Sequence, residues 1–223
     1  NIHYPTDSSL LWDTWRVATR LLERARDKCR ESVPHRFHTR KVKKLWLNVT
    51  RYITSKSKAR QQKVKAWFRT LIERVDWIVA LAGDFCKTYQ SSSHLELSVL
   101  ALELADYLPS MQTVAATARR ANIEGETVPA SDRVFSLFEP HAELIKRGKR
   151  QKPVEFGHKV LLRETAEKFI TDYEVYEQQQ PDSSLTEPVI ERHKQLFGER
   201  PVVLAADKGF CPEKSKYEEL AKL

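Results

Sequence analysis

This chain of 223 residues contains few cysteines and no long apolar run. Its three cysteines, Cys29, Cys86 and Cys211, are odd in number and far apart, which disfavours a disulfide framework or a zinc knuckle and favours a reduced, cytosolic protein. No apolar run approaches the roughly 18 residues of a spanning helix, and 30% of the residues are charged. The N-terminus also lacks a basic segment followed by an apolar stretch, so neither a membrane protein nor a secretion signal is expected.

Acidic residues are almost absent from one basic segment. Residues 35–74 contain thirteen Lys and Arg and a single acid, Glu73, so this segment carries +12 and the rest of the chain −4, within a formal net charge of +8. A merely solvated helix face usually pairs Glu with Lys at i,i+4, and this segment does not. The pattern therefore favours a nucleic-acid contact over a solvated face. The residues predicted to bind DNA here are Lys41, Lys43, Lys44, Arg51, Lys56, Lys58, Arg60, Lys63 and Lys65.

Roughly the first 120 residues show apolar side chains at helical spacing. The pattern predicts a first helix to about Glu31, capped by Asp7 or Ser8, and further helices over about 41–53, 64–81 and 97–108. The segments 54–60 and 91–93 read as breaks between them. Trp46 and Trp67 lie within the basic segment, but they match the apolar stripes, so core packing is favoured over stacking on flipped bases.

After a linker at 123–132, the pattern changes to strands. Residues 133–140, 154–164 and 169–178 are predicted strands, and His158 is expected on the apolar face of the second. Between the first two lies the basic run "KRGKRQK", which we expect at a hairpin tip that contacts the DNA backbone. Its cations are Lys146, Arg147, Lys149, Arg150 and Lys152.

The run "VVLAAD", residues 202–207, follows a predicted helix that Gly198 ends. A short apolar strand after a helix is typically central and parallel, and ligands collect beyond the carboxyl ends of such strands. Asp207 is therefore a candidate ligand for Mg²⁺, which prefers one or two carboxylates. A plain turn aspartate before Gly209 is an equally good interpretation from spacing alone. Asp7 and Asp182 are better explained as helix caps, Asp132 as a turn residue, and Glu139 has no assigned role.

Several motifs in order along the chain resemble bacterial insertion-sequence transposases of the Asp-Asp-Glu type, in particular the ISNCY-type members. They are "NIHYPTDSSLLWD", "RVFSLFEPHAELIKRGK", "EFGHKVLL" and "AADKGF". The resemblance implies an RNase H-like catalytic fold, Mg²⁺ or Mn²⁺, DNA as partner, a homodimer on DNA and a cytoplasmic, nucleoid-associated bacterial protein. It also implies that Asp207 is the second catalytic aspartate. The first aspartate and the glutamate are then expected beyond Asn1 and Leu223, so the chain is expected to be a fragment.

The predicted fold class is therefore mixed α/β: an RNase H-like mixed sheet in the C-terminal half, with a large helical insertion in the N-terminal half. The expected division is a first-strand tail at 1–8, a basic helical insertion at 9–123 and an incomplete RNase H-like core at 124–223. The expected function is Mg²⁺-dependent DNA cleavage and strand transfer. A catalytically dead DNA-binding relic, another RNase H-like nuclease and a helical scaffold with a basic face remain alternatives.

Overall fold

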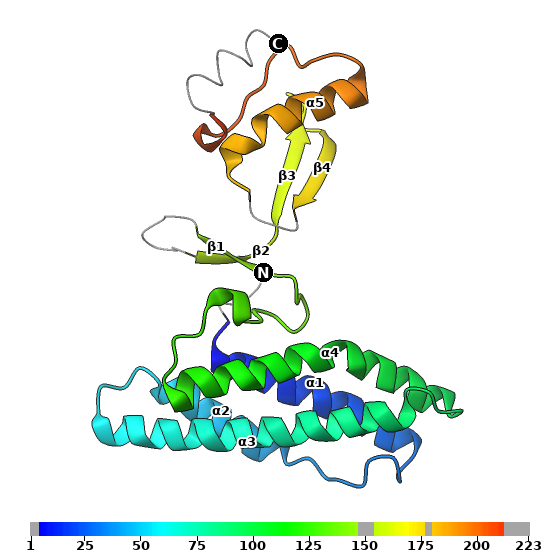
Figure 1. Ribbon diagram of the computed structural model, residues 1–223, viewed down its shortest axis with the longest axis vertical. Coiled ribbons are helices and arrows are strands. Elements are labelled where there is room, and N and C mark those ends of the chain that lie inside the picture. The colour runs from blue at the N-terminus through cyan, green and yellow to red at the C-terminus, as the bar shows by residue number, and fades with distance from the viewer. Residues whose placement is uncertain (1–4, 147–153, 177–179, 212–223) are drawn as a thin grey trace. The chain divides into compact units, whose positions relative to one another are not determined.

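The computed structural model describes residues 5–146, 154–176 and 180–211, which contain both helices and strands (Figure 1). The chain divides into two compact units, residues 1–157 and 158–223. The first unit, here the helical unit, contains four long helices and a short hairpin. Residues 124–146 and 154–157, which the sequence groups with the second half, belong to the helical unit.

Helix α1 (Asp7–Lys28) begins with a capping box formed by Thr6 and Ser9. The Ser9 amide donates to Thr6 Oγ1 at 3.2 Å, and the Thr6 amide donates to Ser9 Oγ at 2.9 Å. The prediction that Asp7 or Ser8 caps this helix is wrong. Thr6 has the extended backbone that an N-cap requires, with φ −109° and ψ 152°, whereas Asp7 is already helical.

Helices α2 (Thr39–Tyr52), α3 (Lys58–Tyr89) and α4 (Leu95–Arg119) complete the bundle, with α4 packed on α1 and α3, and α2 packed on α3 (Figure 1). Helix α3 extends past the predicted end because Ala82, Phe85 and Cys86 continue its buried stripe. Leu11, Trp15, Leu71, Ile78 and Leu104 are among the fully buried side chains of the common core. The four predicted helical stretches are thus confirmed.

A π-helical turn, Arg120–Glu124, and a 3₁₀ turn, Ala130–Asp132, follow α4. The predicted strand at 133–140 is wrong, because this segment is irregular. Apolar residues of this segment pack against the core of the helical bundle instead, and Leu137, which is 3% exposed, is part of that core. Ser136 Oγ accepts from the amides of Phe138 and Glu139 at 3.2 and 3.1 Å, which bends the chain away from a strand.

Strands β1 (Glu143–Lys146) and β2 (Val154–Gly157) form an antiparallel pair, and the helical unit ends at the last residue of β2. The predicted strand at 154–164 is interrupted at His158, and β3 (Lys159–Glu164) pairs with β4 (Ile170–Tyr176) in the second unit, also antiparallel. Gly157, with φ 144°, adopts a backbone conformation that suits glycine at this break. The strand predicted at 169–178 is confirmed over Ile170–Tyr176.

Helix α5 (Thr186–Phe197) ends at Gly198, which has φ 78°, as the sequence predicts. The predicted central strand at 202–206 is wrong, because residues 201–207 have no strand conformation. Val202 is 99% exposed and Val203 is 82% exposed, so the segment is not buried either. Among the described residues both sheets are two-stranded and antiparallel, and no parallel pair forms.

Candidate nucleic-acid interface

The basic segment forms helix α2, the turn after it and the first turns of α3. All thirteen cations between positions 35 and 74 are exposed, because the buried positions of these helices are apolar residues such as Val42, Val49, Val64 and Phe68. This set, here the basic surface, includes every predicted DNA-binding residue of the segment. The members are Arg36, Arg40, Lys41, Lys43, Lys44, Arg51, Lys56, Lys58, Arg60, Lys63, Lys65, Arg69 and Arg74.

The cations of the basic surface differ from the other cations of the described chain in how they are paired with acids. Cations elsewhere are commonly paired, as in Arg16–Asp13 at 2.8 Å, Lys28–Glu96 at 2.6 Å and Arg120–Glu126 at 2.5 Å. None of the thirteen cations of the basic surface forms an ion pair with a side chain that the structure describes. Exposed cations without such partners are available to bind phosphate groups.

The two tryptophans in the predicted interface are packing residues. Trp46 stacks on Trp12, with ring centroids 5.4 Å apart and an interplanar angle of 11°. Trp67 contacts Tyr52 at 5.9 Å, and Arg60 lies over the Tyr52 ring at 5.5 Å. The preference for core packing over base stacking is therefore confirmed for both residues, which fix α2 against α1 and α3.

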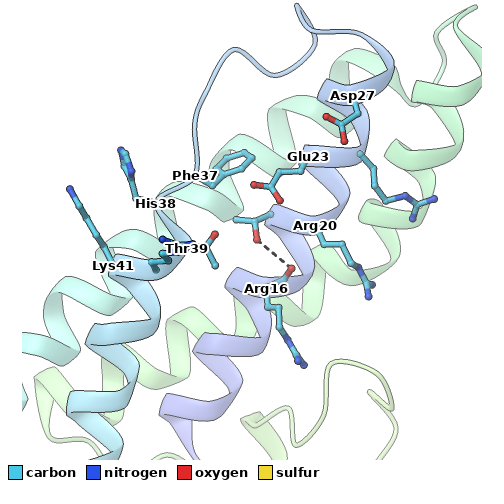
Figure 2. A pocket seen from close by; sticks show the side chains of 11 residues that line it. Arg16, Arg20, Glu23, Asp27, Phe37, His38, Thr39 and Lys41 are labelled. Carbon is cyan, nitrogen blue, oxygen red and sulfur yellow. Dashed lines mark hydrogen bonds between the residues drawn. The ribbon is translucent and has the colours of Figure 1, made fainter.

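A groove beside the basic surface lies between α1 and the segment that leads into α2 (Figure 2). Its volume is about 870 Å³. Arg16 and Arg20 from α1 line it, together with Phe37, His38 and Lys41 from the opposite side. Glu23 and Asp27 also line it, so its charge is mixed and it suits an anion less well than the basic surface does.

The second predicted basic element, residues 146–152, is only partly described. Lys146 is the last residue of β1 and lies opposite Val154 of β2, so the two strands that flank the run pair antiparallel as the hairpin prediction requires. Arg147, Lys149, Arg150 and Lys152 lie outside the described residues. The contribution of this run to DNA binding stays a prediction.

Asp207 lies at the start of a 3₁₀ turn, Lys208–Phe210, in an exposed segment of the second unit. Its Oδ1 accepts a hydrogen bond from the Lys208 amide at 2.7 Å, which is the geometry of a turn aspartate. Asp182, on a neighbouring 3₁₀ turn, lies against Gly209: its Oδ2 is 3.0 Å from the place a Cβ would take there. It also forms an ion pair with Lys159.

Several other acids of this unit form ion pairs, among them Asp172, Glu174 and Glu191. Asp172 binds Arg163 and Arg192, and the hydrogen bond from Arg192 is the main reason that the pKa of Asp172 lies below its usual value. In the described part of the chain, no three Asp, Glu, His or Cys side chains are grouped as metal ligands. The binding of Mg²⁺ or Mn²⁺ at Asp207 stays a prediction.

Two acids of the helical unit, Asp7 and Asp132, have structural partners. Asp7, at the first position of α1, accepts from Arg133 Nη1 and from Asn122 Nδ2, both at 2.7 Å. Asp132 pairs with Arg120 at 3.1 Å. The sequence contains no signal for the contact between Asp7 and Arg133, because the two residues are 126 positions apart and Arg133 lies in an irregular segment without periodicity.

Comparison with known proteins identified no relatives: no protein-family model, no curated protein and no solved structure matches the chain. Within the residues that the structure describes, no helix is both long enough and apolar enough to cross a bilayer.

Proposed function

We propose that the helical unit binds DNA through the basic surface, in a protein of the Asp-Asp-Glu transposase type that the motifs resemble. The observation that supports DNA binding is a set of thirteen exposed cations on α2, on α3 and in the segments directly before and after α2, none of which pairs with an acid that the structure describes. Lysine and arginine side chains on helices neutralise phosphates and release counterions, which supplies affinity without reading the base sequence.

The test is a titration of a random-sequence duplex, by fluorescence anisotropy, at salt concentrations from about 50 to 200 mM, the range over which phosphate contacts weaken steeply. The variant Lys43→Glu/Lys58→Glu/Lys63→Glu removes three cations of the basic surface. If each contacts one phosphate, the slope of log Kobs against log salt becomes shallower by about 2.7. An unchanged slope would contradict the proposal.

A matched control changes the same number of charges elsewhere. Lys87→Glu/Lys168→Glu/Lys194→Glu alters three exposed lysines outside the basic surface. Lys87 is on the same helix as Lys63 but 24 positions away, about 36 Å at 1.5 Å per residue. This distance exceeds the Debye length of about 8–10 Å, and Lys168 and Lys194 belong to the second unit, so the control is expected to keep the slope of the unmodified protein.

Catalysis is a separate part of the proposal and rests on the resemblance. In the proposed transposase, Mg²⁺ or Mn²⁺ acts at Asp207 and at two further carboxylates, within an RNase H-like fold, on DNA held by a homodimer. Asp207→Ala is then expected to abolish cleavage of transposon-end DNA and to preserve binding. DNA binding without cleavage would favour the catalytically dead relic, and hydrolysis without strand joining would favour another RNase H-like nuclease.

A further inference from the structure

A cavity of about 470 Å³ lies between α2 and α3 on the basic surface. Its size is within the range of about 300–1,000 Å³ that is typical of small-molecule sites. Trp77 from α3 and Trp15 from α1 form its aromatic wall. We call it the Trp77 cavity.

Trp77 is held in place by rings but is not covered. Its ring centroid lies 6.2 Å from that of Trp15, 6.1 Å from that of Phe37 and 5.6 Å from that of His35, which meets it edge-on at 86°. The side chain nevertheless keeps 37% of its surface exposed, unlike Trp15, which is 1% exposed. A partly exposed indole fixed by neighbouring rings presents a rigid surface on which a nucleobase can stack.

The charges around the Trp77 cavity have one sign. Arg36, Lys41, Lys44 and Arg74 line it, and no acidic residue does. All four are exposed and belong to the basic surface, which forms no ion pair with any side chain in the described ranges. The larger groove in Figure 2 differs in this respect, because Glu23 and Asp27 line it. The Trp77 cavity therefore combines an aromatic surface with cations that a phosphate requires.

Polar side chains are also available for the edge of a base. His38, Asn48 and Thr70 line the same cavity. The Thr70 hydroxyl donates to Ala66 O at 3.2 Å, so its oxygen is free to accept. The Asn48 amide supplies both a donor and an acceptor, and these groups match the donors and acceptors of a base edge.

We propose that the Trp77 cavity binds one unstacked nucleotide of DNA, with its base on Trp77 and its phosphate on Arg36, Lys41, Lys44 and Arg74. The proposal rests on the DNA binding proposed above and adds a preference for single-stranded or extruded nucleotides over continuous duplex. Trp46 and Trp67 are less exposed than Trp77 and their rings pack on Trp12 and Tyr52, so neither offers such a site.

The test compares three DNA probes with the full chain: a duplex, the same duplex with a short single-stranded tail, and that tail with abasic sites in place of its bases. The abasic tail keeps the phosphate charge and removes only the bases. We expect the tail with bases to bind about 5- to 140-fold more tightly than the abasic tail, since stacking contributes about 1–3 kcal/mol per base and 1.4 kcal/mol is a factor of ten. Equal affinity for the two tails would overturn the proposal.

Two variants locate the effect. Trp77→Ala is expected to remove the preference for bases and to leave duplex affinity and its salt slope unchanged. Arg74→Glu, on the rim of the cavity, is expected to weaken binding of the tailed probe more than Lys87→Glu, which makes the same change of charge at an exposed position on the same helix. If Trp77→Ala does not fold, Arg74→Glu and the abasic comparison decide the question alone.

The outcomes also separate this proposal from DNA binding itself. If none of the three probes binds, the proposed function fails. If the affinities of the three probes differ only as their numbers of phosphates do, and all fall steeply with salt, the protein binds DNA but the Trp77 cavity is not a nucleotide site.

Discussion

Asp7 joins the start of α1 to the segment that follows α4, and its removal gives a quantitative test of the fold. Its carboxylate accepts from Arg133 Nη1 and Asn122 Nδ2, both at 2.7 Å, and its side chain is 17% exposed. Hydrogen bonds to charged groups contribute about 1.5–3 kcal/mol when buried. Arg133 is 28% exposed, so solvent screening places each of these contacts nearer 1 kcal/mol.

Asp7 also lies in the first turn of α1, where a negative charge interacts favourably with the helix dipole by about 0.3–1 kcal/mol. Asp7→Ala is therefore expected to lower the free energy of unfolding by about 2–3 kcal/mol. In a unit of 157 residues this corresponds to a decrease in Tm of about 4–12 °C.

Tryptophan fluorescence measures this change in the helical unit alone. All five tryptophans of the chain, Trp12, Trp15, Trp46, Trp67 and Trp77, belong to that unit. Asp13→Ala is the matched control on the same helix. Burial raises the pKa of Asp13 despite its pair with Arg16, so its charged form gains little from folding. A loss for Asp7→Ala no larger than that for Asp13→Ala would refute the reasoning.

Two further predictions concern thiol reactivity and pH. Cys211 is exposed and is expected to react rapidly with a thiol reagent in the native protein, whereas Cys86 is 4% exposed, has its pKa raised by burial and is expected to react only on unfolding; comparable rates for the two would contradict this. The hydrogen bond from Arg120 lowers the pKa of Glu126 in the folded state, so its contribution is present above the unfolded value of about 4.3 and is lost as the pH falls through the folded pKa. The Tm difference between the unmodified protein and Glu126→Gln should therefore shrink on acidification, and a difference that is constant with pH would argue against this contact.

The spacing of apolar residues predicts the helices correctly, but the strand predicted to end at Asp207 does not form. The helices were predictable because each apolar stripe reports burial within one element, as Val64, Phe68, Leu71 and Val75 do in α3. A strand needs a neighbour, which its own residues do not specify. The run "VVLAA" has the composition of a buried strand, yet no described segment pairs with it and Val202 is 99% exposed.

Counting charges along the sequence identifies the basic segment, but no sequence pattern predicts the Trp77 cavity. Its wall and rim come from three helices: Trp15 from α1, Lys41 and Lys44 from α2, and Trp77 and Arg74 from α3. In the sequence Trp77 lies off the apolar stripe of α3, with the charged residues Glu73 and Arg74 four and three positions before it, so the pattern predicts neither a core role nor a site for it. Its remaining exposure and the cations beside it become evident only in the structure.

The absence of ion pairs between the basic surface and the acids that the structure describes supports the anionic partner proposed above. Like charges one helical turn apart destabilise a helix by about 0.2–0.5 kcal/mol per pair, and α2 carries such neighbours at Arg40, Lys43, Lys44 and Lys41. Neither α2 nor the first turn of α3 contains an acid that would offset this repulsion. The helices form because Val42, Val49, Val64 and Phe68 bury their apolar side. The unpaired cations of the basic surface therefore do not stabilise the fold. When a polyanion binds, its attraction to these cations offsets the repulsion between them.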